Sequence, residues 1–367
     1  MFKSHGSLLL GAATFLAFGT SAFTSGAADA NVVAGVGTSS VLAATDFNNG
    51  SLDFYWEAAG SPSWSTAEHV AGQGTTSSFA AVAQVGNSAV IAAQGPNGLD
   101  FYWQAIGSPT WSPAQVVASV DATQGTPAIA QVGQSTVIAA QTPSGQINFY
   151  YQPIGSPTWS KPQQVTGSAS GSPAGTYGYP AVTQVGNAAV IVAQGPGATL
   201  WMFWEQIGSA KWTAEKVAGA NSTDTQPSVA QVGQSTVIAA GGDNTLYTYS
   251  QPIGGTTWTP DAVTTDSEGF HDPSITQVGN AAVVAVYRDE LNSQSQIQTS
   301  LYSYVSTPIG NATWTPHQVT QYGPFNGGGD PTIAQVDGSA VIGVPLSNGT
   351  GLFYWESGWN WHPETVG

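Results

Sequence analysis

Two short motifs recur in register along the chain, and they constrain its fold more than any other feature. A Gly-x-x-x-Trp motif places its tryptophan at Trp64, Trp111, Trp159, Trp212, Trp258 and Trp314, with a shortened copy ending at Trp361. A Gln-Val-Gly motif or a close variant begins at Gln84, Gln131, Gln184, Gln231, Gln277 and Gln335, with Val36-Gly37 in the first copy. Two independent markers with a common period of about 47 residues indicate seven repeats of one structural unit.

Each repeat contains four short segments rich in Val, Ile, Phe and Tyr and separated by Gly, Pro, Asn or Ser. In the third repeat the segments are 128–132, 136–141, 147–152 and 163–166. These compositions are typical of strands joined by turns, and no helical period of useful length occurs. Four strands at this period predict a blade whose faces are buried only by neighbouring blades. We therefore predict an all-β protein, a seven-bladed β-propeller of four-stranded antiparallel blades, over residues 31–367. A β-solenoid is the alternative, although its rungs are usually shorter.

Residues 1–30 are typical of a secretory signal peptide. Lys3 precedes an apolar run at 8–23, and Ala28-Asp29-Ala30 offers small residues for cleavage. A signal anchor is the alternative, but the apolar run is short and interrupted by Gly and Thr. No later segment is long and apolar enough to span a membrane. We expect a secreted, extracellular protein without membrane insertion after removal of the signal.

The charge balance limits the partners of the chain. It has 5 Lys and Arg against 21 Asp and Glu, a formal net charge of −16. Nucleic acids and anionic lipids are bound by clustered Lys and Arg, so both are excluded as partners. The chain has no cysteine, which excludes disulfides, thiolate metal sites and a cysteine nucleophile.

The last position of the third segment changes its character from repeat to repeat. It holds Trp56, Trp103, Tyr151, Trp204, Ser250, Val305 and Trp355. A position needed only for packing should vary among apolar residues of similar volume, whereas this one ranges from indole to serine. Aromatic faces suit the apolar C–H side of a sugar ring, and ligand sites combine such surfaces with a few polar groups. The predicted ligand-binding residues are Trp56, Trp103, Tyr151, Trp204 and Trp355, and repeats five and six lack the aromatic. Core packing between blades is the alternative.

Other residues of the repeat have structural explanations. Asp53, Asp100 and Asn148 lie three positions earlier in the same segments, so alternation places them on the opposite face, where they would serve a neighbouring gap. The tryptophan of each Gly-x-x-x-Trp turn is expected to fill the space between blades and to donate its N–H to a backbone carbonyl.

A second region departs from the repeat. Up-and-down topology places on one face the loops before repeats six and seven and the long insertion within repeat six. These loops carry Asp266, Glu268, His271, Asp272, Arg288, Asp289, Glu290 and Asp330. Loops that depart from a scaffold often carry function. The secondary candidate site is His271, Asp272, Arg288 and Asp330, either as a calcium site or as a carboxylate pair for glycoside hydrolysis. Solvated surface acids are the alternative. No cofactor is otherwise expected, because the spacing matches no metal motif.

The third repeat carries a resemblance to a known family. Pro127-Ala-Ile-Ala-Gln-Val-Gly133, Val137-Ile-Ala-Ala, Ile147-Asn-Phe-Tyr-Tyr151 and the Trp159 turn resemble the seven-bladed propeller lectins of the fucose-binding bacterial type. The resemblance implies shallow sugar sites between blades, lined by aromatic side chains. The turn also resembles the tail of the Asp-box of sialidase-like propellers, but lacks its aspartate in every copy. That family uses three arginines on the substrate carboxylate, and Arg288 is the only arginine here, so sialidase activity is excluded.

The sequence therefore predicts a multivalent, lectin-like protein rather than an enzyme, with glycans or cell-surface polysaccharide as partners. Repeated weak sites on one rigid ring would act by avidity. A Gly-x-Ser-x-Gly nucleophile elbow and a His-Glu-x-x-His zinc motif are both missing. Two alternatives from other classes remain open. They are an extracellular protein-interaction scaffold and a polysaccharide hydrolase or lyase that uses the acidic loops near repeats six and seven.

Overall fold

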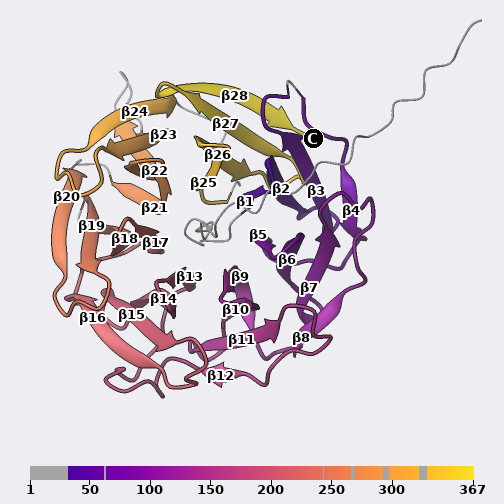
Figure 1. Cartoon of the computed structure of the whole chain (residues 1–367), viewed down its shortest axis with the longest axis horizontal. Helices are drawn as coiled ribbons and strands as arrows, with labels where there is room; N and C mark the ends of the chain where they lie inside the picture. The colour runs from indigo at the N-terminus through magenta and orange to yellow at the C-terminus, as the bar shows by residue number, and fades with distance from the viewer. Residues whose placement is uncertain (1–31, 62, 243, 266–268, 292–296, 322–328) are drawn as a thin grey trace, which may run out of the picture.

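The computed structural model shows a closed ring of seven antiparallel sheets, each made of four strands that are consecutive in the chain (Figure 1). It describes residues 32–61, 63–242, 244–265, 269–291, 297–321 and 329–367. The predicted all-β, seven-bladed propeller is confirmed, and the solenoid alternative is wrong. In the described part of the chain, no helix is long and apolar enough to cross a membrane.

The first four blades follow the predicted repeat, with one inner, two middle and one outer strand each. Blade 1 consists of β1 (Val33–Val36), β2 (Ser39–Asp46), β3 (Ser51–Ala58) and β4 (Glu68–Ala71). Blade 2 consists of β5 (Ala81–Val85), β6 (Ser88–Gly95), β7 (Gly98–Ala105) and β8 (Gln115–Ser119). Blade 3 consists of β9 (Gln124–Val132), β10 (Ser135–Gln141), β11 (Ile147–Pro153) and β12 (Gln163–Gln164). Blade 4 consists of β13 (Ala181–Val185), β14 (Ala188–Gly195), β15 (Thr199–Gln206) and β16 (Thr213–Ala218).

The last three blades have longer outer strands than the first three. Blade 5 consists of β17 (Ser228–Val232), β18 (Ser235–Gly242), β19 (Thr245–Pro252) and β20 (Thr259–Thr265). Blade 6 consists of β21 (Phe270–Val278), β22 (Ala281–Leu291), β23 (Ile297–Ser306) and β24 (Thr315–Thr320). Blade 7 consists of β25 (Thr332–Val336), β26 (Ser339–Pro345), β27 (Gly351–Ser357) and β28 (Asn360–Val366).

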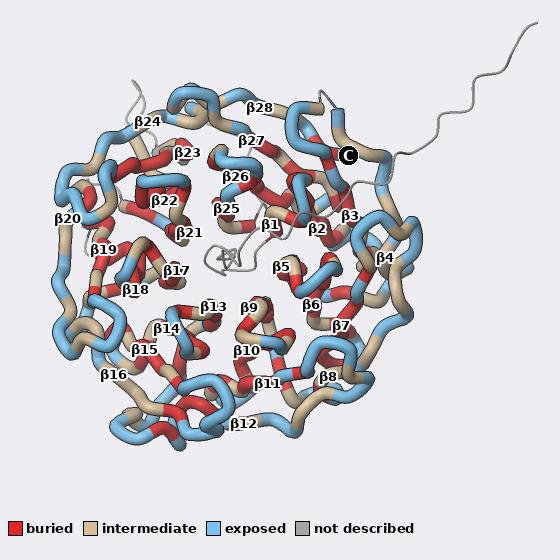
Figure 2. Tube along the Cα trace, viewed as in Figure 1, coloured by how far each residue is buried: buried red, intermediate tan, exposed pale blue. Residues whose placement is uncertain are grey.

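The core is divided among the interfaces between adjacent blades. Seven apolar clusters lie between neighbouring sheets, one at each interface. Burial is concentrated in the inner and middle strands and gives way to exposed residues at the periphery (Figure 2). Both faces of a blade are covered by its neighbours, so the middle strands are almost continuously apolar instead of alternating. We refer to the interface between blades 1 and 2 as interface 1/2, and to the others in the same way.

The Gln-Val-Gly motif joins each blade to the one before it. The Gln131 side chain accepts a hydrogen bond from the Gly86 N–H of blade 2 (2.8 Å) and donates to the Gly133 carbonyl of its own turn (3.0 Å). The same inter-blade bond occurs at five further interfaces. Blade 1 carries Gly35 at this position. A Cβ there would lie 2.9 Å from the Gln335 carbonyl oxygen, so the close approach of the first and last inner strands requires glycine.

The turn tryptophans fill the interfaces, as the sequence predicts. Each of the seven packs against the cluster between its own blade and the preceding blade. The predicted backbone acceptor for the indole N–H is wrong. Six of the seven indoles donate to side chains of the preceding blade, and the Trp111 indole nitrogen has no hydrogen-bond partner among the described residues. Examples are Trp258 to Glu215 (3.0 Å) and Trp314 to Asp261 (2.9 Å). The mixed polar and apolar character of indole suits it to this half-buried position.

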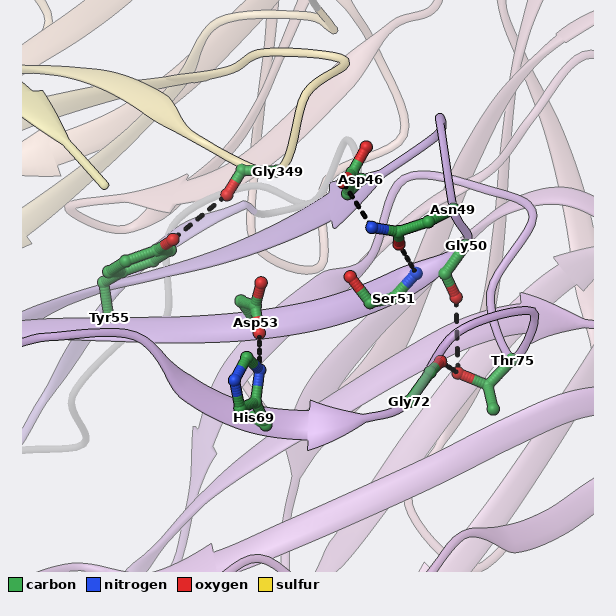
Figure 3. A network of polar contacts seen from close by, with 10 residues as sticks. All are labelled: Asp46, Asn49, Gly50, Ser51, Asp53, Tyr55, His69, Gly72, Thr75 and Gly349. Atoms are coloured by element: carbon green, nitrogen blue, oxygen red, sulfur yellow. Dashed lines mark hydrogen bonds and ion pairs between the residues drawn. The ribbon is translucent and has the colours of Figure 1, made fainter.

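The ring closes without exchange of a strand, because blades 1 and 7 are each built from four consecutive strands. The Val33 N–H donates to the Thr332 hydroxyl across interface 7/1 (3.2 Å). Further out, the Tyr55 hydroxyl donates to the Gly349 carbonyl (3.2 Å; Figure 3). Interface 7/1 is therefore joined by contacts between residues from opposite ends of the described chain.

Candidate functional site

The variable aromatic position lies at the end of the third strand of each blade, beside the turn to the fourth. We call it the rim position. Side chains alternate along a strand, so the rim side chain lies on the same face as the residue two positions earlier in the chain. In blade 1, Trp56 shares a face with Phe54, which packs into interface 1/2. The rim position of every blade therefore stands at the edge of the interface with the following blade.

Most of the rim aromatics are accessible to solvent. The exposed fractions are 42% for Trp56, 48% for Trp103, 37% for Tyr151 and 37% for Trp355. Trp204 is half-buried and packs against the cluster at interface 4/5, whereas Val305 is buried. Core packing thus accounts for part of the Trp204 environment and for Val305. Four predicted ligand-binding residues present surface that a ligand can reach, and their assignment as sugar contacts stays a prediction.

In blades 1–3 a serine keeps the space opposite the rim aromatic open. The Trp56 N–H donates to the Ser65 hydroxyl (3.1 Å), and the Ser65 N–H donates to the Trp56 carbonyl (2.8 Å). The same pair of bonds joins Trp103 to Ser112 and Tyr151 to Ser160. Serine follows the turn tryptophan directly in these blades, and the fourth strand begins only later. The residue that pairs with each of these rim aromatics is therefore a small serine and not a large side chain.

Blade 7 differs because its fourth strand pairs with the third along its whole length. His362 lies directly opposite Trp355, and the two rings stack at 4.2 Å between centroids with 20° between their planes. One face of the Trp355 indole is therefore covered within its own blade. Sequence reasoning treated the five aromatics as equivalent, whereas the structure leaves Trp56 and Trp103 more exposed than Trp204 and Trp355.

Polar partners of the rim position come from the fourth strand, and sequence reasoning missed them. Glu68 accepts hydrogen bonds from the Trp56 indole N–H (3.0 Å) and from the Gln104 amide of blade 2 (2.8 Å). It holds an indole edge, a carboxylate and an amide together at interface 1/2. These are the polar groups that bind sugar hydroxyls, placed beside an aromatic face.

Equivalent residues occupy other interfaces, where the indole that they bind belongs to the turn tryptophan instead of the rim aromatic. Gln115 accepts from the Gln152 amide (3.2 Å) and the Trp159 indole (3.3 Å) at interface 2/3. Glu215 accepts from Gln251 (2.7 Å) and Trp258 (3.0 Å) at interface 4/5. The sequence contained a signal for these residues. A polar residue stands two positions before a valine in every fourth segment: Glu68, Gln115, Gln163, Glu215, Asp261, His317 and Glu364.

The polar residues three positions before the rim aromatics do not contact them. The Asp53 carboxylate pairs with His69 Nδ1 of its own blade at 2.5 Å (Figure 3). Asp100 is buried, and this burial raises the pKa of its carboxyl group. The Asn148 amide is 3.5 Å from the Tyr150 hydroxyl. Their placement on the face opposite to the rim position agrees with the alternation of the strand.

A groove of about 630 Å³ lies at interface 7/1. It is lined by Tyr55, Ser63, Trp64, Ser65, Thr66, Ala67, Glu364, Thr365 and Gly367. Two aromatic side chains, several hydroxyls and one carboxylate thus border a single hollow. These residue types also suit a sugar, so interface 7/1 has a concave surface beside its rim position.

The acidic loops bring together two of the four residues predicted there. Asp272, at the start of β21, and Asp330, just before β25, are hydrogen-bonded to each other through their carboxyl groups. Burial, followed by the charge of Asp272 and this hydrogen bond, holds the pKa of Asp330 well above its ordinary value. The Gln226 N–H also donates to Asp272 (3.3 Å). One proton shared between two carboxyls is the arrangement that these contacts favour.

His271 and Arg288 do not join this pair into one site. His271 Nε2 contacts the Asp289 carboxylate at 2.8 Å. The Arg288 guanidinium lies 3.9 Å from Glu290 and 5.1 Å from the centre of the Tyr302 ring. Consecutive residues of β22 alternate in direction, so Arg288 and Asp289 point to opposite faces of blade 6. Of the four predicted residues, the contacts among the described residues join only Asp272 and Asp330, and the assignment of a site to them stays a prediction.

Two further acids of this predicted region, Asp266 and Glu268, lie outside the described residues. Within the described ranges, no three His, Asp or Glu side chains are grouped closely enough to hold a metal ion. The calcium site suggested by the sequence stays a prediction.

Comparison with known proteins identifies a shared fold but does not identify a family. No protein-family model matches the chain, and no curated protein matches its sequence. Many solved structures share its architecture. The SapL1 lectin in complex with α-methyl fucoside is 14% identical, with a TM-score of 0.51 over 78% of this chain and 95% of that one. The six-bladed Aleuria aurantia lectin is 13% identical, with a TM-score of 0.50 over 80% and 95%. An ulvan lyase of polysaccharide lyase family PL25 is 10% identical, with a TM-score of 0.55 over 78% and 82%.

The expected likeness to fucose-binding propeller lectins is thus confirmed at the level of fold. At these identities the likeness concerns the fold alone, and the same ring also supports an enzyme. The function of this chain has to be argued from its own residues.

Proposed function

We propose that this protein is a secreted, multivalent carbohydrate-binding protein whose sites lie at the rim positions of interfaces 1/2 and 2/3. The observation that supports this most strongly is the exposed Trp56 indole, with Glu68 and Gln104 hydrogen-bonded beside it. A sugar ring stacks on such a face while its hydroxyls bind the carboxylate and the amide. Glycans or cell-surface polysaccharide are the partners that fit this arrangement.

Repetition supports the same proposal. Trp103 occupies the equivalent rim position of blade 2 and is the most exposed of the rim aromatics. Two or more shallow sites on one rigid ring bind a polyvalent surface far more tightly than any single site does. The likeness of the fold to fucose-binding lectins is consistent with this proposal, and a deoxy sugar suits a largely apolar face.

A glycan array with the purified protein tests the proposal, with Trp103→Ala and Val116→Ala as a matched pair of variants. Val116 lies on the outer strand of the same blade and is 53% exposed. We expect selective binding to one sugar class, weakened at least about ten-fold by Trp103→Ala because the stacking surface is lost, and unchanged by Val116→Ala.

A blank array with folded protein, or equal losses in both variants, contradicts the lectin proposal. The first of these results shifts the assignment to a protein-interaction scaffold.

A polysaccharide hydrolase or lyase is the second candidate, and one observation favours it. Asp272 and Asp330 share a hydrogen bond, and the pKa of Asp330 is raised, as in carboxyl pairs that divide acid and base roles. Turnover of any polysaccharide that is abolished by Asp330→Asn, with binding to the array retained, supports this candidate. Turnover that survives the substitution removes Asp330 from the mechanism.

A further inference from the structure

Interface 7/1 lacks a contact that the repeat supplies at every other interface of the described ring. Elsewhere the glutamine of the inner strand accepts a hydrogen bond from the preceding blade. Blade 1 has Gly35 at this position, and glycine has no side chain with which to accept. The inner strands at this interface therefore lack the glutamine bond and are joined instead by the bond from the Val33 N–H to the Thr332 hydroxyl.

The outer part of the same interface is also unlike the others. Two positions of the repeat meet at each interface: the residue directly after the rim position and a residue of the preceding blade's fourth strand. At interface 7/1 these are Glu57 of blade 1 and Glu364 of blade 7. The other interfaces carry Gln104 with Glu68, Gln152 with Gln115, Glu205 with Gln163, Gln251 with Glu215, Ser306 with Asp261, and Glu356 with His317. At these two positions, interface 7/1 is the only one of the seven interfaces in the described ring that opposes two carboxyl groups.

The two carboxyl groups have different surroundings. Glu364 accepts hydrogen bonds from the Trp64 and Trp355 indoles, both at 2.9 Å. Glu57 is 6% exposed and is hydrogen-bonded to Glu364, while its Oε1 has no hydrogen-bond partner. Because the Glu364 oxygens already accept two indole N–H groups, a proton shared by the pair is placed on Glu57, whose O–H donates to Glu364.

The other ionisable groups that face this interface do not neutralise the pair. Asp53 of β3 is paired with His69 of β4, as Figure 3 shows, and Tyr55 of β3 donates to a backbone carbonyl. His362 of β28 stacks on the Trp355 ring. The strands β3, β4, β27 and β28 are described throughout and contain no lysine or arginine.

We propose that interface 7/1 is a proton-dependent latch, in which one proton shared by Glu57 and Glu364 holds the ring closed and its loss loosens this interface. Burial, followed by the charge of Glu364 and the hydrogen bond to it, raises the pKa of Glu57 from 4.5 to about 7. The latch is thus intact in mildly acidic solution. The groove beside Trp64 and Glu364 lies at this same interface.

The sign of the pH dependence follows from linkage. The Glu57 carboxyl ionises near its ordinary pKa of 4.5 in the unfolded chain but only near 7 in the folded ring. Between these values the folded state holds one more proton than the unfolded state, so the free energy of unfolding falls as the pH rises. The contribution of the latch is largest below about pH 4.5 and is lost above about pH 7.

Thermal unfolding at pH 5 and pH 8 tests the latch with two reciprocal variants. Glu57→Gln gives interface 7/1 the acid–amide pair of interface 1/2, and Gln104→Glu places an acid pair with Glu68 in interface 1/2. We expect the melting temperature of the unmodified protein to fall between the two pH values by roughly 5 °C more than that of Glu57→Gln. Gln104→Glu should show a larger fall than the unmodified protein.

Other groups that titrate, including Asp330, are common to all three proteins and cancel in the comparison. Parallel pH dependence in the unmodified protein and Glu57→Gln overturns the latch. If Glu57→Gln does not fold, Gln104→Glu decides alone, and an unchanged pH slope in that variant also overturns it. Amide exchange, corrected for its intrinsic pH dependence, locates the effect. We expect faster exchange at pH 8 in β28 but not in β8, and equal changes in the two strands contradict the proposal.

Discussion

Blades 1–3 and blades 5–6 are built on the same repeat but differ at the rim position and at the start of the fourth strand. Blades 1–3 carry an exposed aromatic opposite a serine, and their fourth strands begin several residues after the turn tryptophan. In blades 5 and 6 the fourth strand begins directly after this tryptophan, and Thr259 and Thr315 pair with Ser250 and Val305. Packing at the interfaces imposes one sequence pattern on the inside of every blade, and the rim is free to differ.

Two kinds of tryptophan in the same ring provide the largest expected contrast. Trp212 is buried at interface 3/4, so Trp212→Ala should leave a cavity and lower the free energy of unfolding by about 3–5 kcal/mol. Trp103 is exposed, so Trp103→Ala should change it by no more than about 0.5 kcal/mol. Chemical denaturation of the two variants measures both values. A large loss of stability in Trp103→Ala shows that the rim aromatic belongs to the core.

A gain of function at blade 5 extends the comparison to binding. Ser250→Trp supplies the missing aromatic beside Asp261, an acceptor already present at that interface. We expect the variant to bind an immobilised glycan about two- to ten-fold more tightly, because one more site contributes to avidity. Surface plasmon resonance compares it with Ser250→Ala. Identical binding of the two variants indicates that an aromatic at the rim position does not by itself make a site.

The pair formed by Asp272 and Asp330 predicts a smaller effect, which is on the pH dependence of stability. Because the pKa of Asp330 is raised in the folded ring, the folded state keeps a proton that the unfolded state loses, and stability falls as the pH rises above about 4. Asp330→Asn removes this dependence and should be more stable than the unmodified protein at neutral pH. Melting curves from pH 4 to pH 8 test this. A variant that keeps the full pH dependence of the unmodified protein shows that another group is responsible.

The sequence predicted the features that the repeat determines. The strand content, the number of blades and the role of the turn tryptophans at the interfaces all follow from a sequence pattern that recurs in seven repeats. Asp272 and Asp330 were expected on one face because topology places their loops there, and they do meet. His271 and Arg288 were expected with them, but His271 contacts Asp289, and Arg288 lies near Glu290 and the Tyr302 ring.

Contacts across interfaces were harder to predict than contacts within a blade. Glu68 meets Gln104 only because two adjacent blades pack face to face, and no spacing within one repeat indicates that pairing. Glu57 and Glu364 lie near opposite ends of the described chain and meet only when the ring closes. Each residue alone resembles a polar residue of an ordinary strand, so their opposition becomes visible only in three dimensions.

The most direct test of the proposed rim sites is a crystal structure of the protein with the monosaccharide that binds best on the array. We expect sugar stacked on Trp56 and Trp103 with its hydroxyls near Glu68 or Gln115, and none at the rim positions of blades 5 and 6. Sugar bound only elsewhere, for example beside Asp272 and Asp330, would contradict the proposed rim sites.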